Sequence, residues 1–268
     1  MNLADRYGPW ALITGASEGT GSAFARQLAG AGINCVLVAR RTAPLEALRN
    51  ELSRDFGIEV SVLSIDLALP GAAAQIAAAV DGKEIGIAIL NAGADPNGSR
   101  FLDQILTEWV ALAYRNTITA IELCHIFGGP MRARGRGGII LVGSGAGYGG
   151  AGHMAVYAGT KAFDLCFAEG LWAELKPHGV DVLSLMMGRT DTPAHRENLA
   201  RRGQDIPAGM ARSEDVARDG LARLPFGPVH NMGLADDVGS PMQPSAASRR
   251  TRVEVLEGMA AKTFGSKA

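Results

Sequence analysis

Cysteine is scarce in this sequence: its 268 residues include three, Cys35, Cys124 and Cys166. They are odd in number, lie far apart and have apolar neighbours. This pattern argues against a disulfide framework and against the paired spacing of a metal site. Because structural disulfides belong to oxidising compartments, we expect a cytoplasmic protein without a bound metal.

An excess of one charge and long apolar runs are also absent. The 26 lysines and arginines nearly balance 27 acidic residues, for a net charge of −1, which gives no electrostatic support for nucleic-acid binding. No apolar run approaches the roughly 20 residues of a membrane helix, and the first ten residues lack the apolar core of a signal peptide. We therefore expect neither a nucleic-acid nor a membrane partner.

The hydrophobic content of 47% is ordinary for a globular protein with a core. Apolar runs that read as strands alternate with helical patterns, and the strands are expected at 10–14, 33–39, 58–65, 85–90, 138–143 and 179–186. Nearly continuous apolar strands joined by helices indicate a parallel sheet covered on both faces. No linker or repeat divides the chain, so we expect one α/β domain over residues 1–268.

Three regions depart from simple alternation. Residues 101–127 read as one long helical region, and a polar stretch at about 189–210 reads as a mobile loop or short helices over the carboxyl edge of the sheet. The tail from about 232 to 268 has no clear pattern until 248–264. There, apolar residues recur at helical spacing: Val253, Leu256, Met259, Ala260 and Phe264. We expect this segment to pack against the body or a neighbour, near the substrate pocket.

A glycine-rich turn separates the first strand from the first helix. Gly15, Gly19 and Gly21 lie in this turn, where small residues let backbone amides approach a pyrophosphate at the positive end of the helix. The position of the turn, rather than its glycines alone, indicates a nucleotide site.

The end of the second strand discriminates between the two nicotinamide cofactors. NAD enzymes typically place an acidic residue there, whereas this chain has Arg40 and Arg41. Guanidinium groups suit a 2′-phosphate, so we expect NADP(H) to be preferred, with NAD(H) possible. Two surface arginines are the alternative interpretation, and the negative charge of Glu18 counts slightly against a phosphate site.

Tyr157 and Lys161 lie four residues apart on an expected helix and therefore share a face. A free phenol has a pKa of roughly 10, and a fixed ammonium beside it favours the phenolate. Such a tyrosine can act as a general acid or base near neutral pH. Ser144 ends the strand at 138–143, where open α/β sheets bind ligands. An ordinary pair on a solvated helix face is the alternative.

Taken together, these motifs resemble the short-chain dehydrogenase/reductase family over roughly residues 8–192. The matching residues are Thr14, Gly15, Gly19, Thr20, Gly21, Asp66, Asn91, Ala92, Gly93, Asn116, Ser144, Tyr157 and Lys161. The resemblance implies a three-layer, Rossmann-like, doubly wound sheet of about seven mostly parallel strands. It also implies reversible hydride transfer between the nicotinamide and a carbonyl or alcohol substrate, in a homodimer or homotetramer.

The resemblance assigns roles to individual residues. Tyr157 would be the general acid or base, Lys161 would hold the nicotinamide ribose, Ser144 would polarise the substrate oxygen, and Asn116 would hold a water in a proton path. The cofactor contacts would be Gly15, Ser17, Gly19, Thr20, Gly21, Arg40, Arg41, Asp66, Leu67, Asn91, Ala92, Gly93, Tyr157, Lys161, Gly188, Thr190 and Thr192. Asp66 would meet the adenine amino group, and residues 91–93 the adenosine half. Both are alternatively turn residues.

Subunit contacts are expected along the two long helices. The candidates are Trp109, Leu112, Leu123, Phe163 and Trp172, which alternatively face the sheet of their own chain.

Departures from the family pattern lie outside the catalytic set. Met187 stands where the family has proline, and residues 227–231 offer only a shortened seventh strand. An epimerase or dehydratase of the same fold is one rival function, and a catalytically silent NADP(H)-binding sensor or scaffold is another. The intact set of Asn116, Ser144, Tyr157 and Lys161 argues against the silent protein.

Overall fold

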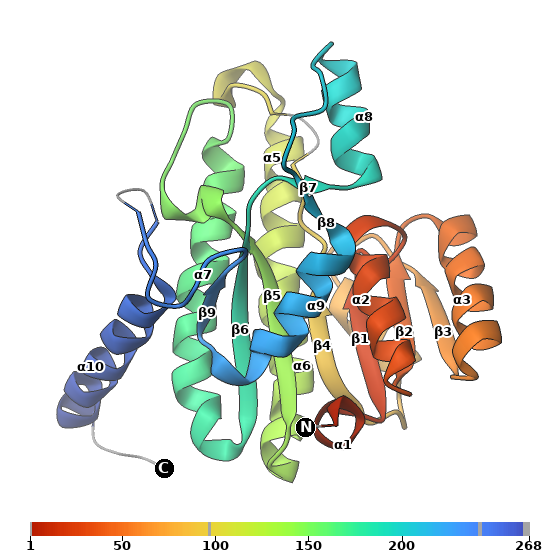
Figure 1. Ribbon diagram of the computed structural model, residues 1–268, viewed down its shortest axis with the longest axis vertical. Helices are drawn as coiled ribbons and strands as arrows, with labels where there is room; N and C mark the ends of the chain where they lie inside the picture. Colours follow the sequence, from red (N-terminus) through yellow and green to blue (C-terminus); the bar gives the residue numbers. More distant parts are fainter. Residues whose placement is uncertain (1, 96–97, 241–242, 265–268) are drawn as a thin grey trace.

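The computed structural model describes residues 2–95, 98–240 and 243–264. Its centre is a seven-stranded sheet in the order β3-β2-β1-β4-β5-β6-β9, and each neighbouring pair is parallel (Figure 1). The strands are β1 (Trp10–Thr14), β2 (Asn34–Ala39), β3 (Val60–Ser64), β4 (Ile85–Leu90), β5 (Gly137–Ser144), β6 (Val180–Met187) and β9 (Val229–Asn231). The predicted doubly wound α/β class is confirmed, and β9 is the shortened seventh strand.

Helices cover both faces of this sheet. One face carries α2 (Gly19–Gly30), α3 (Thr42–Phe56) and α9 (Ser213–Arg223), and the other carries α4 (Ala72–Ala79), α6 (Thr119–Arg134) and α7 (Ala155–Leu175). The strand order reverses between β1 and β4. In open α/β sheets, ligands bind at the carboxyl ends of the strands beside such a reversal.

The two larger apolar clusters of the core lie one on each face of the sheet. Along β1, Ala11 and Ile13 pack into the α2–α3–α9 cluster, whereas Trp10 and Leu12 pack into the α4–α6–α7 cluster. Successive side chains of a strand point to opposite faces, so burying both faces requires apolar residues at every position. This explains why the strands read as continuous apolar runs.

The long helical region expected over about 101–127 consists of several helical elements in the structure and extends to Arg134, beyond the expected end. A 3-10 turn (Phe101–Asp103) precedes α5 (Leu106–Ala113), a π-helical turn (Tyr114–Ile118) follows, and α6 continues to Arg134. Pro130 lies inside α6, and Gly135 ends it in the left-handed conformation with φ 72°. A π turn carries one residue more than an α turn, and this one contains the buried Asn116.

The polar stretch after β6 contains a short helix. The strands β7 (Thr190–Asp191) and β8 (Ala211–Arg212) pair in a two-stranded sheet, and α8 (Pro193–Arg201) lies between them in the chain. Residues 189–210 were expected to form a mobile loop or short helices, and the structure has a short helix there. A further helix, α1 (Leu3–Tyr7), precedes β1 and was not predicted from the sequence.

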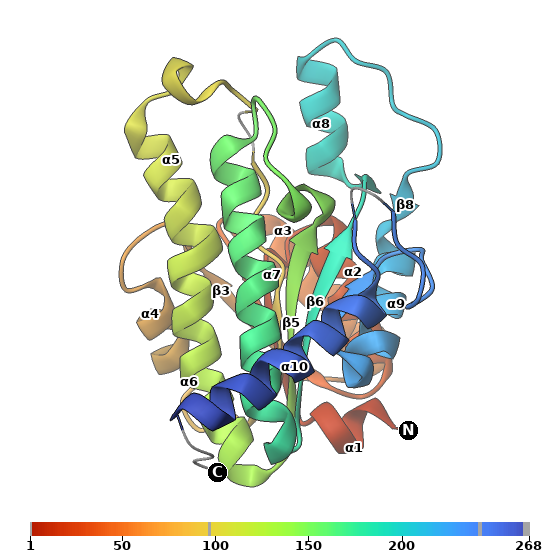
Figure 2. The same ribbon diagram turned by 90° about the vertical axis from the view of Figure 1, so that its left-hand side faces the viewer.

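The tail forms α10 (Ala246–Phe264), which crosses the outer side of α7 (Figure 2). Arg249 donates two hydrogen bonds to Glu169 of α7, at 2.6 and 2.8 Å. Val253 is buried in the α4–α6–α7 cluster, whereas Leu256 is exposed. Met259, Ala260 and Phe264, expected on the same face, have side chains outside the described part. The tail therefore packs against the body through the Arg249–Glu169 ion pair, the buried Val253 and hydrogen bonds from Arg250 to the carbonyls of Phe226 and Gly227.

The expected subunit contacts need correction. Trp109, Leu112, Leu123 and Trp172 are buried within their own chain. Leu123 and Trp172 pack into the α4–α6–α7 cluster on the sheet, so the alternative interpretation holds for these two. Phe163 remains half-buried and stacks on Phe167. Within the described residues, no helix has both the length and the apolar character that a membrane crossing requires.

Candidate active site

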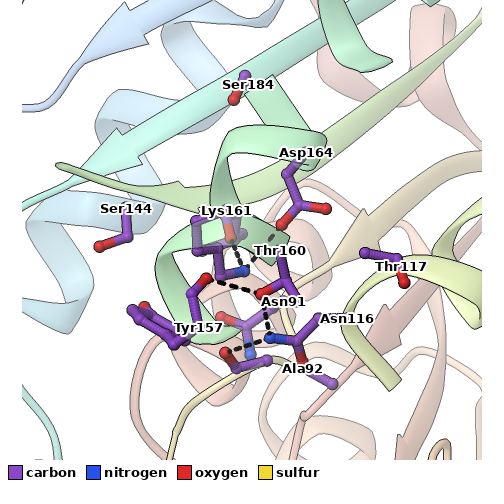
Figure 3. A network of polar contacts seen from close by, with 12 residues as sticks. Asn91, Ala92, Asn116, Thr117, Ser144, Tyr157, Thr160, Lys161, Asp164 and Ser184 are labelled. Atoms are coloured by element: carbon purple, nitrogen blue, oxygen red, sulfur yellow. Dashed lines mark hydrogen bonds and ion pairs between the residues drawn. The ribbon is translucent and has the colours of Figure 1, made fainter. Parts of the chain in front are cut away.

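The residues expected to carry the chemistry meet at the carboxyl edge of the sheet. Ser144 ends β5, Tyr157 and Lys161 lie on α7, and Asn116 comes from the π turn between α5 and α6 (Figure 3). Thr160 links the last two elements, because its Oγ1 accepts from Asn116 Nδ2 at 3.0 Å and donates to the Tyr157 carbonyl at 2.8 Å. The structure thus brings the four predicted residues to one place.

Lys161 lies deep in the site, with 4% of its surface exposed. Its Nζ donates to the Val142 carbonyl and to Asp164 Oδ2, each at 2.9 Å. A Cβ added to Gly93 would come within 2.9 Å of Nζ and 3.3 Å of Asn116 Oδ1. Gly93 therefore carries no side chain because the lysine ammonium needs the space.

Tyr157 and Ser144 lie on one side of Lys161, and Asp164 lies on the other (Figure 3). Both hydroxyl residues are half-buried. Ser144 Oγ accepts a hydrogen bond from the Ala146 amide at 3.2 Å, so the hydroxyl hydrogen is available for another acceptor. The arrangement offers two hydroxyl groups next to a fixed positive charge.

Asn116 is buried between Gly93 and α7. Its Nδ2 also donates to the Gly93 carbonyl at 3.2 Å, while its Oδ1 is buried and has no hydrogen-bond partner among the described residues. A cavity of about 10 Å³ lies beside it, lined also by Thr14, Arg115 and Asp164. That is about the space one water needs.

The turn between β1 and α2 fits the pyrophosphate of a dinucleotide. Gly15 and Gly19 have φ of 65° and 56°, a conformation that favours glycine. No side chain caps the first turn of α2, and that turn contains no acidic residue. Its amide groups and the positive helix end are therefore open to an anion. Glu18 does not compete for these amides, because its carboxylate is paired with Arg41.

Asn91 holds this turn in place. Its Nδ2 donates to the carbonyls of Thr14 and Gly15, each at 3.2 Å. The backbone amides of Asn91 and Ala92 in turn donate to Thr14 Oγ1, at 3.0 and 3.1 Å. The Asn91 side chain therefore ties the end of β4 to the glycine turn, a role that its motif alone did not reveal.

The two arginines after β2 have different surroundings. Arg41 pairs with Glu18 and also donates to Ser17 Oγ at 3.3 Å, whereas Arg40 is exposed and has no side-chain partner in the described part of the chain. Burial lowers the pKa of Arg115, and the nearby positive charge of Arg40 lowers it further. The guanidinium groups of Arg40 and Arg115 therefore lie near each other. Arg40 is free to bind a ligand, whereas Arg41 is paired with Glu18.

Asp66 and Leu67 follow β3. One Asp66 carboxylate oxygen accepts a hydrogen bond from the Ala68 amide at 3.0 Å, as expected of a turn residue. Leu67 is buried, and its carbonyl accepts from Thr119 Oγ1 at 2.8 Å. Both residues are fixed where the third strand reaches the site.

The segment after β6 lies over the glycine turn. Thr192 caps α8 by accepting from the His195 amide at 3.1 Å, and its Cγ2 would come within 2.9 Å of a Cβ added to Gly19. Thr190 is buried and donates to the Gly188 carbonyl at 3.4 Å. Thr20 is buried within α2. Of the predicted cofactor residues of this segment, Thr192 therefore lies next to the first turn.

Three residues of the site were missed from the sequence. Thr160 orients Asn116, Arg115 lies near Arg40, and Asp164 holds Lys161. A signal existed for Asp164, since a carboxylate three residues after a lysine on a helix shares its face. Nothing in the local sequence pairs Arg115 with Arg40, because that contact depends on the fold.

A doubly wound parallel sheet, an open glycine turn and a Ser-Tyr-Lys group at the carboxyl edge define a dinucleotide-dependent oxidoreductase of the α/β class. The comparisons agree with this class. The profile of the family described as short chain dehydrogenase matches residues 9–203. The chain belongs to this family, whose enzymes interconvert CH–OH and C=O groups.

The chain is also similar to individual members of this family. A 7beta-hydroxysteroid dehydrogenase from Collinsella aerofaciens is 34% identical over 199 residues, which cover 74% of this chain and 75% of the relative. A solved structure from work on 7beta-hydroxysteroid dehydrogenase stereoselectivity has a TM-score of 0.82 at 28% identity, covering 95% of this chain and 100% of the other. A short-chain dehydrogenase from Sphingobium yanoikuyae in complex with NADPH has a TM-score of 0.77 at 29% identity, covering 97% of each chain.

Proposed function

We propose that this protein is an NADP(H)-preferring oxidoreductase that interconverts a ketone and a secondary alcohol, with Tyr157 as the general acid and base. One observation carries the proposal: the buried Lys161 ammonium is fixed one helical turn after Tyr157, at the end of β5 beside Ser144. A positive charge in this position favours the phenolate that proton transfer requires.

Bound NADP(H) supplies or accepts a hydride at C4 of the nicotinamide. During ketone reduction, in which the cofactor would supply the hydride to the carbonyl carbon, Tyr157 donates its hydroxyl proton to the carbonyl oxygen. Ser144 donates a hydrogen bond to the same oxygen and stabilises its developing negative charge. Lys161 stabilises the phenolate that remains, and a water in the small cavity beside Asn116 would continue the proton path. Alcohol oxidation reverses each step.

The cofactor preference rests on Arg40. Its guanidinium is exposed and without a side-chain partner in the described chain, next to the turn that would hold the adenosine half. Arg115 adds a second positive charge nearby. A 2′-phosphate would relieve the repulsion between these two groups, whereas the 2′-hydroxyl of NAD(H) would not. The solved NADPH complex of a relative supports this preference.

For the substrate, we propose a bulky cyclic secondary alcohol or ketone, with a hydroxysteroid as the first compound to test. The relatives named 7beta-hydroxysteroid dehydrogenases support this substrate class. Part of the loop after Ser144 also leaves space, because a Cβ added to Gly149, Gly150 or Gly152 would meet nothing within 4 Å. Gly147 is different, since its added Cβ would lie 2.7 Å from the Lys161 carbonyl oxygen.

The test combines turnover and binding. The purified protein is assayed with NADPH and NADH on hydroxysteroids, ketosteroids and smaller ketones, and both dissociation constants are measured by nucleotide fluorescence. We expect NADPH to bind about ten- to a hundredfold more tightly, since a charge-assisted hydrogen bond contributes about 1.5–3 kcal/mol. Arg40→Ala should remove most of this difference, and the matched control Arg54→Ala, an exposed arginine on α3, should not.

Several results would contradict the proposal. Equal or tighter NADH binding by the unmodified protein would refute the cofactor preference. Binding of NADPH without turnover of any carbonyl or alcohol would favour the silent sensor. Turnover with no net change in nicotinamide absorbance would favour an epimerase or dehydratase.

A further inference from the structure

A carboxylate outside the expected catalytic set holds the ammonium of Lys161. Asp164 lies almost one turn further along α7, and its Oδ2 accepts from Lys161 Nζ at 2.9 Å. Each of the two side chains is 5% exposed. Among the described residues, the Asp164 carboxylate accepts a hydrogen bond from Lys161 and from no other group. We propose that Asp164 is a positioning residue for Lys161, which fixes the charge and direction of the ammonium before the cofactor binds.

The helix places the three side chains in a row. Tyr157, Lys161 and Asp164 are spaced four and then three residues apart, so they share one face of α7. Tyr157 and Asp164 lie on opposite sides of Lys161 (Figure 3). Asp164 therefore acts on the phenol through the ammonium and does not exchange a proton with it directly.

Burial makes this pairing necessary. An isolated ammonium with so little water contact is costly, and a backbone carbonyl alone leaves its charge uncompensated. The two groups also affect each other, because burial raises the pKa of the Asp164 carboxyl while the adjacent Lys161 ammonium lowers it. Without the carboxylate, we expect the lysine side chain to leave this position and turn towards solvent.

The surrounding groups leave the ammonium few other positions. Gly93 and Asn116 lie close to the ammonium, because a Cβ added to Gly93 would come within 2.9 Å of Lys161 Nζ and 3.3 Å of Asn116 Oδ1. Val142 and Asp164 accept from the ammonium at 2.9 Å each. Of the three ammonium hydrogens, one then remains for the cofactor ribose. Asp164 thus selects the direction in which Lys161 meets its ligand.

This inference rests on the proposed function, and its test uses NADPH as the probe. Asp164→Asn keeps the shape and removes the charge. We expect the NADPH dissociation constant to rise about tenfold, since a charge-assisted contact is replaced by a weaker one, and turnover to fall by a similar factor. Asp164→Glu restores the charge and should bring affinity back to within about threefold of the unmodified protein.

A matched control separates positioning from structural support. Asp181 is also a little-exposed carboxylate, paired with Arg6 at 2.5 Å and with Tyr7 at 2.6 Å, but it lies near the amino end of β6, away from the site. Asp181→Asn should lower thermal stability and leave NADPH affinity unchanged. If Asp164→Asn behaves like this control, Asp164 is structural and the proposal is wrong. Asp164→Ser is the second neutral variant if Asp164→Asn does not fold.

A double-mutant cycle tests whether the effect passes through the lysine. In a Lys161→Met background, Asp164→Asn should cause no further loss of NADPH affinity, and it should stabilise the ligand-free protein by removing an unpaired buried carboxylate. An equal loss of affinity in both backgrounds would overturn the proposal. If the unmodified protein binds no nicotinamide nucleotide, the proposed function fails together with this inference. Normal binding and turnover in both the unmodified protein and Asp164→Asn would overturn the inference alone.

Discussion

Arg249→Met tests how the tail helix is held. The Arg249 side chain is 15% exposed, and its partner Glu169 is 5% exposed. Breaking a buried ion pair costs about 3–5 kcal/mol, because the remaining charge loses its compensation. Arg252 lies 3.7 Å from the same carboxylate and offsets part of this loss. We therefore expect the unfolding free energy to fall by about 2 kcal/mol, and Tm by about 4 °C.

The pH dependence of this loss gives a second measurement. Burial raises the pKa of Glu169, and Arg249 opposes that increase. In Arg249→Met, the pKa of Glu169 in the folded state should therefore be still higher. A group with a raised folded pKa stabilises the folded state below its unfolded pKa and loses that contribution as pH rises through the folded pKa. The stability difference between the variant and the unmodified protein should thus be larger at pH 8 than at pH 5.

Urea unfolding at both pH values measures this difference. Arg252→Met is the matched control, because its side chain is 58% exposed and lies farther from the same carboxylate, at 3.7 Å. An ion pair with such an exposed arginine contributes about 0–1 kcal/mol. Equal losses in the two variants, or a loss at pH 5 as large as at pH 8, would refute the role of the Glu169–Arg249 pair.

Three further predictions concern the site, the tail and assembly. Gly93→Ala should lower turnover by at least about tenfold, because the new methyl group displaces the Lys161 ammonium; unchanged steady-state kinetics would contradict this. Truncation after Ser245 should lower Tm or change KM, and a shortened protein identical in both would show that α10 has no such role. The expected dimer would bury the exposed apolar side chains of Val110 and Ile118, so Val110→Asp should make the protein monomeric in light scattering, and a monomeric unmodified protein would exclude this interface.

The strands could be predicted because their burial imposes a local pattern. Both faces of the sheet are covered, so strands such as β1 and β4 consist of apolar residues, and the glycine turn follows β1 directly. The site residues at strand ends followed from this order, since the carboxyl ends of parallel strands lie at one edge. A short strand such as β9 was harder to define, because its three residues carry little pattern.

Features that depend on tertiary contacts could not be predicted. The Gly-Gly-Pro sequence at 128–130 obscured the continuation of α6, which packing on the sheet maintains despite Pro130. The pairing of Arg41 with Glu18 joins two different turns and leaves Arg40 as the available charge. Likewise, Arg249 and Glu169 are 80 residues apart and meet only after α10 has docked.

The most direct test of the proposed mechanism is Tyr157→Phe, measured side by side for NADPH binding and for turnover of an identified substrate. The variant removes one hydroxyl and leaves the glycine turn and Lys161 in place. We expect turnover to fall at least about a hundredfold, since a positioned acid contributes two to four decades of rate. The NADPH dissociation constant should stay within about threefold. Near-normal turnover in this variant would show that another group is the acid and that the mechanism is wrong.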